Sequence, residues 1–341
     1  MKKQLSSASG SAPKIVVIGG GTGLSTMLRG LKQYSSDITA IVTVADDGGG
    51  SGVLRSELGM LPPGDIRNCI QALAGAEPTM EALLSYRFTE GSLKGQSFGN
   101  LFLAALNGMS PSFDVAVAKM SEVLNITGRV LPVTNEDIHL AAEFDDGTEI
   151  FGESCIHTHK RGAQRHIRKV RLIPERPKTL PACVEAVERA DLVILGPGSL
   201  YTSIIPNLLT DSLAKAVAES DAVRVFVLNV MTEDGETEGY AASDHIRAIF
   251  SHADARLFDY CLANSSPFSG EIAARYGLEG AEPVVLDEEQ VKALGVTLIR
   301  APIAGHHSRF ARHDSDALAE ALLSLYREAS PTRIYTGSGQ R

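Results

Sequence analysis

Two adjacent carboxylates mark the stretch of the sequence in which side-chain chemistry is most concentrated. Asp46 and Asp47 follow the apolar run "ITAIVTVA" and precede a glycine-rich segment that contains Gly48 and Ser51. Two carboxylates next to backbone amides could hold a divalent cation such as Mg²⁺, or accept hydrogen bonds from a sugar or a base. Glycine would let the backbone approach such a ligand closely. The alternative is a solvated turn that caps the following helix.

A second glycine-rich loop lies near the start of the chain. In "VVIGGGTGL", Gly20, Gly21, Thr22 and Gly23 separate an apolar run from a helical pattern. The N–H groups at a helix N-terminus attract anions, so this loop predicts a phosphate contact. The dinucleotide fingerprint G-x-G-x-x-G is not met, because Leu24 occupies its third glycine position. A tight turn that only packs is the alternative.

Two further loops carry a similar signature. "LGPGSLYTS" follows an apolar run and contains Gly196, Gly198 and Ser199, while "LNVMTEDGET" ends another run and contains Asn229 and Thr232. In parallel α/β sheets, ligands bind in the crevice outside the carboxyl ends of the strands. We therefore expect these loops and the two acidic residues to face one crevice.

Continuous apolar runs alternate with helical patterns along most of the chain. Runs of this kind, with helices between them, predict a parallel sheet covered on both faces, and hence a Rossmann-like α/β fold. The expected strands lie at 14–20, 38–45, 191–198, 223–232, 283–287 and 296–303.

The middle of the chain departs from this alternation. Residues from about 65 to 124 are predicted to form a helical block, and residues from about 129 to 173 a β-hairpin region with a turn at Asp146 and Gly147. We expect one domain with loose ends. Its predicted bounds are 14–327, with a disordered tail at 1–13 and a flexible tail at 328–341.

Composition limits the classes of function. The 341 residues carry a formal net charge of −9, from 32 basic and 41 acidic side chains. This balance argues against a general nucleic-acid binder, because phosphate contacts need clustered Lys and Arg. The four cysteines form no CxxC pair, which indicates a reducing compartment. Because no apolar run approaches the ~20 residues of a membrane helix and no signal peptide is present, we expect a cytoplasmic protein without a membrane partner.

Two histidine-containing segments carry weaker signals. For "IHTHKRGAQRHIRKVRL" we expect a solvated strand face rather than a nucleic-acid patch. The spacing of His157 and His159 would place both on one face of this strand, but no Asp or Glu at ligand spacing accompanies them, so we do not expect a metal site. In "GHHSRFARHDSD", Arg309, Arg312 and His313 precede a helical pattern, and a cation there could pair with a diphosphate. A surface turn with Asp314 as the helix cap is the alternative.

Seven motifs occur here in the order in which one protein family has them: "GGGTGL", "VTVADDGGGSG", "PPGDIRN", "GQSFGNL", "GPGSLYTSIIPNL", "NVMTEDGET" and "RHD". On these motifs the sequence, from about Lys14 to about Arg327, resembles the bacterial gluconeogenesis factors, which are uridine-diphosphosugar-binding proteins related to 2-phospho-L-lactate transferase. The resemblance implies a Rossmann-like cytoplasmic protein, often dimeric, that binds UDP-N-acetylglucosamine. It also implies a role in carbon partitioning, cell-wall precursor supply and cell shape during gluconeogenic growth, with a regulatory protein as a further partner.

The resemblance extends the set of expected ligand-binding residues to the helical block and to the C-terminal part of the chain. The transferase relatives need Mg²⁺, which Asp46 and Asp47 would hold here. The complete predicted set is Gly20, Gly21, Thr22, Gly23, Asp46, Asp47, Gly48, Ser51, Asp65, Asn68, Asn100, Gly196, Gly198, Ser199, Asn229, Thr232, Tyr276 and Arg312.

The sequence departs from the family pattern at two places. Gln96 stands where the family usually has histidine, which removes a proton donor but keeps hydrogen bonding. Glu233 and Asp234 stand where the family commonly has Gln-Pro, and they add negative charge near the expected diphosphate. The acidic pair could tune the choice of ligand or simply face solvent.

Three functions fit these observations. The first, which we favour, is a regulatory protein that binds UDP-N-acetylglucosamine without turnover. The second is a Mg²⁺-dependent transferase of the 2-phospho-L-lactate type. The third, a nicotinamide-dependent oxidoreductase, is weakened by the missing third glycine and by the lack of an acidic residue in the usual ribose-binding context.

Overall fold

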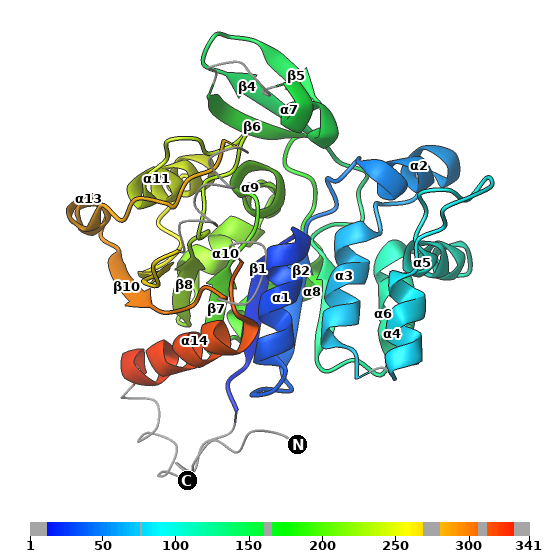
Figure 1. The fold of residues 1–341 in the computed structure, drawn as a ribbon, viewed down its shortest axis with the longest axis horizontal. Coiled ribbons are helices and arrows are strands. Elements are labelled where there is room, and N and C mark those ends of the chain that lie inside the picture. The colour runs from blue at the N-terminus through cyan, green and yellow to red at the C-terminus, as the bar shows by residue number, and fades with distance from the viewer. Residues whose placement is uncertain (1–11, 76, 160–165, 269–279, 306–311, 331–341) are drawn as a thin grey trace.

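A parallel sheet forms the centre of the computed structural model, which describes residues 12–75, 77–159, 166–268, 280–305 and 312–330 (Figure 1). The strand order in this sheet is β10-β9-β8-β7-β1-β2-β3, and the paired strands run parallel. The Rossmann-like α/β fold is therefore confirmed. The strands are β1 (Ile15–Gly19), β2 (Ile38–Val42), β3 (Arg129–Pro132), β7 (Leu192–Leu195), β8 (Val223–Val227), β9 (Tyr260–Asn264) and β10 (Thr297–Ala301).

The central strands are apolar on both faces. Every residue of β1, β2 and β7 is buried, and most are β-branched or otherwise aliphatic. Such runs form strands because both faces of the sheet are covered. The sheet therefore gives the loops at its carboxyl edge a rigid base.

The strand order reverses beside β1. The chain builds β2 and β3 on one side of β1, and then places β7 to β10 on the other side. In doubly wound sheets, the connections that leave the two strands at such a reversal diverge and open a crevice at their carboxyl ends. This topological switch point lies between β1 and β7.

Helices surround the sheet (Figure 1), and the part of the chain that connects β2 to β3 forms a block of helices. The predicted helical block contains α3 to α6, and the structure adds α2 in front of it. Near the chain ends, α1 and α14 pack against each other. The helices are α1 (Gly21–Leu31), α2 (Gly49–Leu58), α3 (Gly64–Leu73), α4 (Pro78–Ser85), α5 (Phe98–Gly108), α6 (Phe113–Val123), α7 (Glu153–His159), α8 (Pro181–Glu188), the π-helix η1 (Leu200–Ile204), α9 (Ile205–Leu208), α10 (Leu213–Glu219), α11 (Ala242–Ala253), α13 (Glu288–Ala293) and α14 (Ser315–Ala329).

A small antiparallel sheet, β5-β4-β6, stands apart from the main sheet together with α7 (Figure 1). Its strands β4 (His139–Phe144) and β5 (Glu149–Phe151) form the predicted hairpin, and β6 (Ile167–Ile173) pairs with the other edge of β4. Gly147 in the hairpin turn has a φ of +81°, which favours glycine. The predicted start of the hairpin region is wrong, because β3 pairs with β2 in the main sheet.

The expectation for the segment that contains His157 and His159 is also wrong in part. These residues belong to helix α7, and the strand in this part of the chain begins only at Ile167. The physical reason is a contact with a distant part of the chain, because the first N–H groups of α7 donate hydrogen bonds to the side chain of Asp47. A hydrogen bond between residues about 100 positions apart leaves no trace in the local sequence pattern.

The last two expected strands had different outcomes. The run at 296–303 contains β10, as predicted. The segment at 283–287 is not a strand of the sheet: Pro283 and Val285 form only isolated bridges, to Met231 and Ala241. The position beside β8 belongs instead to β9, which the sequence did not predict.

Helix α14 extends to Ala329, slightly past the predicted end of the domain. The expected tails otherwise fall almost wholly on residues outside the described ranges. Within those ranges, the helices are too short or too polar to cross a bilayer.

Candidate functional site

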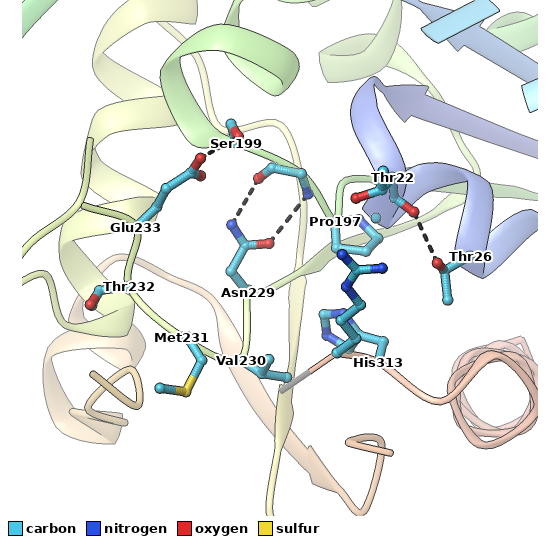
Figure 2. Close-up of a pocket in the computed structure, with 13 residues that line it drawn as sticks. Thr22, Thr26, Pro197, Ser199, Asn229, Val230, Met231, Thr232, Glu233 and His313 are labelled. Carbon is cyan, nitrogen blue, oxygen red and sulfur yellow. Dashed lines mark hydrogen bonds between the residues drawn. The ribbon is translucent and has the colours of Figure 1, made fainter. Parts of the chain in front are cut away.

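A pocket of about 310 Å³ lies at the switch point, where the loops after β1, β7 and β8 meet. We call it the carboxyl-edge pocket, and Figure 2 shows its lining side chains. Its volume is at the lower end of the range for ligand sites in proteins, about 300–1,000 Å³. It is lined by Thr22, Gly23, Thr26, Pro197, Gly198, Ser199, Asn229, Val230, Met231, Thr232, Glu233, Arg312 and His313.

The start of α1 forms one wall of this pocket. The N–H of Gly21, whose φ is +70°, donates to Oδ2 of Asp65 at 2.7 Å, so one end of the helix is already capped by a carboxylate. Gly20 packs so closely against Asp65 that a Cβ atom there would lie 2.7 Å from Oδ2. Thr22 and Gly23 in the first turn line the pocket. First-turn N–H groups have no intrahelical acceptor, so they are available to an anion.

The loop after β7 is held by the loop after β8. Asn229 forms two hydrogen bonds with the backbone of Gly198: its Nδ2 donates to the carbonyl at 2.8 Å, and its Oδ1 accepts from the N–H at 3.2 Å (Figure 2). The same loop contacts α1, because a Cβ atom on Gly23 would lie 2.8 Å from the carbonyl oxygen of Pro197. Asn229 is therefore a residue that positions the loop.

Two glutamates support the same loop from the side of β8. The hydroxyl of Ser199 donates to Oε1 of Glu233 at 2.9 Å. Buried Glu236 accepts hydrogen bonds from the N–H of Tyr201 and the hydroxyl of Thr202, at the start of η1. Burial, and then the nearby charge of Glu233, raise the pKa of Glu236 to about 8. Glu233 lines the pocket, so the acidic departure from the family pattern lies at the site.

Arg312 supplies the positive charge among the described residues that line this pocket. The neighbouring His313 does not add to it, because burial lowers the pKa of its imidazole to about 4. The Nε2 of His313 lies 3.2 Å from the carbonyl oxygen of Leu228, which orients the ring. An anionic ligand would therefore interact mainly with Arg312 and with the first turn of α1.

The segment Asp46–Ser51, which we call the acidic loop, lies beside this pocket at the end of β2. Oδ1 of Asp46 accepts from the N–H of Gly48 at 2.8 Å. Asp47 caps α7, because its two oxygens accept from the N–H groups of Glu153 and Ser154 at 3.1 Å and 2.8 Å. The loop thus connects the main sheet to the small antiparallel sheet.

Carboxyl groups around the acidic loop resist ionisation. Burial raises the pKa of Asp46, and burial together with the charge of Asp46 raises that of Asp65 to about 6. Burial, followed by the charges of Asp46 and Asp47, raises the pKa of Glu153 to about 7. Glu153 therefore exchanges a proton near neutral pH, and Asp65 does so about one pH unit lower.

The contacts of Asp46 and Asp47 bear on the predicted Mg²⁺ site. Within the described residues, no group of three or more His, Cys, Asp or Glu side chains is arranged to hold a metal ion. Mg²⁺ commonly uses only one or two carboxylates together with water and ligand phosphates. Asp46 fits that role better than Asp47, because both oxygens of Asp47 already accept hydrogen bonds from α7. The Mg²⁺ site stays a prediction.

The structure brings many of the predicted residues together, but not all. Asn100 lies buried on α5 and accepts a hydrogen bond from Arg67, and Asn68 lies on α3; neither lines the pocket. Tyr276 lies outside the described residues. The sequence did not single out Glu153 or Glu236, since distant backbone contacts bring them to the site. The predicted residues that line the pocket are Thr22, Gly23, Gly198, Ser199, Asn229, Thr232 and Arg312.

Comparison with known proteins identifies the family. Residues 15–304 match the family model described as 2-phospho-L-lactate transferase CofD. A relative from Thermoanaerobacterium thermosulfurigenes is 53% identical and aligns over 92% of this chain and 97% of its own length. The gluconeogenesis factor of Bacillus subtilis is 47% identical over 94% of this chain and its full length.

A solved structure supports the same relationship. A crystal structure of a Bacillus halodurans protein superposes with a TM-score of 0.88 at 45% identity, and the match covers 92% of this chain and 100% of that one. The fold, the order of the motifs and these relatives agree. The chain therefore belongs to the CofD family and, within it, to the gluconeogenesis factors.

Proposed function

We propose that this protein binds a uridine-diphosphosugar, UDP-N-acetylglucosamine, in the carboxyl-edge pocket and acts as a ligand-dependent regulator during gluconeogenic growth. The observation that carries the proposal is the meeting of the first turn of α1 and Arg312 in one pocket at the switch point. Ligands of doubly wound sheets bind at this position.

The diphosphate is assigned to the side of the pocket formed by α1. The N–H groups of Thr22 and Gly23 and the dipole of the helix attract negative charge there. Arg312 offers a planar set of N–H donors that matches two phosphate oxygens. Asp65 occupies the N–H of Gly21, so the phosphates would bind at the first turn rather than at the helix cap.

The sugar is assigned to the side formed by Glu233. Figure 2 shows Glu233 and Thr22 on opposite sides of Asn229, so a ligand that spans the pocket would meet a cation at one end and a carboxylate at the other. A carboxylate accepts hydrogen bonds from hydroxyl or amide N–H groups, and N-acetylglucosamine has both. Glu233 would therefore favour a sugar over a second phosphate.

The uracil is assigned to a neighbouring cavity of about 290 Å³. This cavity shares Asn229 and Val230 with the carboxyl-edge pocket, and apolar side chains such as Phe268 and Val284 form much of its wall. A flat base stacks well against such a surface. Tyr276, which the family resemblance places at the ligand, would add a second aromatic contact.

A Mg²⁺-dependent transferase of the 2-phospho-L-lactate type is the second candidate. The family model supports it, as does the group of carboxyls with raised pKa beside the pocket, Asp46, Asp65 and Glu153. Carboxyls that exchange protons near neutral pH are suited to acid–base catalysis. A nicotinamide-dependent oxidoreductase has less support, because the glycine fingerprint is incomplete.

Calorimetric titration of the full-length protein separates these functions. We expect heat with UDP-N-acetylglucosamine and UDP, and none with NAD. Losing a charge-assisted contact costs about 1.5–3 kcal/mol, so Arg312→Ala should weaken both uridine ligands roughly ten- to a hundredfold. Tyr276→Ala should weaken uridine ligands only. Lys292→Ala, which removes an exposed cation on α13, is the matched control.

The outcomes distinguish the candidates. Binding that is lost in Arg312→Ala and kept in Lys292→Ala supports the proposal. No heat with any UDP-sugar would refute it. Turnover of a phospholactyl donor in the presence of Mg²⁺, measured by phosphorus NMR, would favour the transferase.

A further inference from the structure

A second polar cavity lies at the opposite edge of the sheet, where β1, β2 and β3 begin. It has a volume of about 160 Å³, and we call it the amino-edge pocket. Because the strands are parallel, this cavity and the carboxyl-edge pocket are at opposite edges of the same sheet, and β1 extends from one to the other. Its lining residues are Lys14, Ile15, Val16, Asp37, Thr39, Arg129, Ala186 and Arg189.

Three cationic side chains from separate elements meet at this pocket. Lys14 precedes β1, Arg129 begins β3, and Arg189 follows α8. This concentration of positive charge contrasts with the chain as a whole, whose formal net charge is −9. All three side chains are exposed to solvent, and an anion bound among them would interact favourably with each.

The carboxylates nearby offset these cations only in part. Asp37 also lines the pocket, but within the described residues it forms no ion pair with Lys14, Arg129 or Arg189. Oδ2 of Asp191 accepts from the backbone N–H of Lys14 at 2.9 Å, which leaves the lysine ammonium group unpaired by this contact. The pocket therefore keeps a net positive charge.

Arg129 is held in a defined orientation. Its Nε donates to Oγ1 of the buried Thr39 at 2.9 Å, across the β2–β3 pair. A guanidinium group has five N–H donors in a fixed plane, and this bond uses one of them. The remaining donors are thus presented by a partly fixed side chain, which reduces the entropy lost when they bind a ligand.

Arg189 alone has a simpler explanation, because a cation at the C-terminal end of α8 is favourable for the helix dipole. That explanation does not extend to Lys14 or Arg129, which belong to other elements. The convergence of all three at one cavity is what requires an explanation.

We propose that the amino-edge pocket binds a small phosphoryl dianion, as free inorganic phosphate or as the phosphate group of a larger molecule. Three cations match the charge and the several oxygen acceptors of a phosphate group. The cavity is about half the volume of the carboxyl-edge pocket, so it accommodates a single phosphoryl group and not a whole nucleotide. The site is separate from the uridine-diphosphosugar site and does not depend on it.

Calorimetric titration at low salt tests this site in the full-length protein. The probes are inorganic phosphate and phenyl phosphate, with chloride at the same ionic strength as the blank. Arg129→Ala and Arg189→Ala should each weaken phosphate binding about tenfold, and the double variant on the order of a hundredfold. Lys292→Ala removes an exposed cation elsewhere and should leave binding unchanged. Binding of phenyl phosphate would show that the site takes the phosphate of a larger molecule; binding of inorganic phosphate alone would assign it to the free ion.

Two results would overturn the proposal. One is the absence of phosphate binding by the parent protein, and the other is equal binding by the double variant and by Lys292→Ala. Phosphate that binds at the carboxyl-edge pocket is recognised by its loss in Arg312→Ala, which should not affect the amino-edge pocket. If the double variant does not fold, Arg189→Ala serves alone, because its side chain has no hydrogen bond to the protein among the described contacts.

Discussion

The glycine-rich loops after β1 and β2 have similar sequences but different surroundings. After β1, the first turn of α1 faces the carboxyl-edge pocket, where Thr22 and Gly23 line an open cavity. After β2, the acidic loop turns its polar groups onto the protein itself, because Asp46 accepts from Gly48 and Asp47 caps α7. The first loop is therefore suited to bind a ligand, and the second anchors a neighbouring element.

The difference shows that a sequence pattern typical of a ligand site can instead form contacts within the protein. A carboxylate near backbone amides looks the same in sequence whether those amides belong to a ligand site or to a helix that arrives about 100 residues later. Asp65 repeats the pattern, since it caps α1 from α3. If this division is correct, changes after β1 should mainly reduce ligand affinity, and changes around the acidic loop should mainly alter stability.

Gly23→Val should have the largest effect. A side chain at this position would begin with a Cβ atom 2.8 Å from the carbonyl oxygen of Pro197, so α1 and the loop after β7 would have to separate. Overpacking of this kind costs about 1–3 kcal/mol of stability. We expect the affinity for UDP-N-acetylglucosamine to fall more than about a hundredfold, measured by calorimetry, since both walls of the pocket move.

Gly108→Ala is the matched control, because a Cβ atom at this position on α5 would contact nothing within 4 Å. It should retain both affinity and thermal stability. A folded Gly23→Val protein that binds as tightly as the parent would show that the loop after β1 only packs and that the ligand lies elsewhere.

Glu153→Gln should change the dependence of stability on pH. The pKa of Glu153 in the folded protein is about 7, above the value of about 4.3 for an unfolded chain. The folded state therefore binds more protons between these values, so this carboxyl makes the parent less stable as the pH rises from about 4.5 to 7. The variant should match the parent near pH 4.5 and exceed its free energy of unfolding by on the order of 2 kcal/mol near pH 8.

Urea denaturation at the two pH values measures that difference. Glu143→Gln provides a comparison, because Glu143 lies on β4 in an exposed ion pair with Arg168. If the free energies of unfolding of Glu153→Gln and the parent depend on pH in the same way, burial and the neighbouring carboxylates do not raise the pKa of Glu153.

Asp47→Ala should have the smallest effect on binding and a moderate effect on structure. It removes the acceptor for the N–H groups of Glu153 and Ser154, and loss of a helix cap costs about 1 kcal/mol. Amide hydrogen exchange in α7 should become faster, while the affinity for UDP-N-acetylglucosamine without added metal stays within about threefold. A loss of affinity as large as that in Gly23→Val would place the acidic loop in the ligand site and end the contrast between the two loops.

The sequence was sufficient for the parts of the molecule that depend on local patterns. The runs that became β1, β2, β7 and β8 were predicted because strands buried on both faces are continuously apolar. The short segment "YCLAN" of β9 was missed, and the similar segment at 283–287 was assigned in its place, since neither length nor composition separates them. The partner strands that decide which segment joins the sheet are far away in the sequence.

The same limit applies to the site. The loops that line the carboxyl-edge pocket were predicted because parallel strands bring their carboxyl ends to one edge. That Asn229 would position Gly198, and that Asp47 would cap α7, depended on contacts between distant segments. Only the three-dimensional structure separates residues that can meet a ligand from those already bonded to the protein.

The pocket is assembled from both ends of the chain, and this has a consequence for biosynthesis. Thr22 and His313 both line it, and the turn after α1 is fixed to α14 by hydrogen bonds from Gln33 to Asp316 and from Tyr34 to Glu320. At about 5–20 residues per second, a ribosome makes the second half of this wall roughly 15 to 60 s after the first. A growing chain therefore carries its glycine-rich loop long before the pocket is complete.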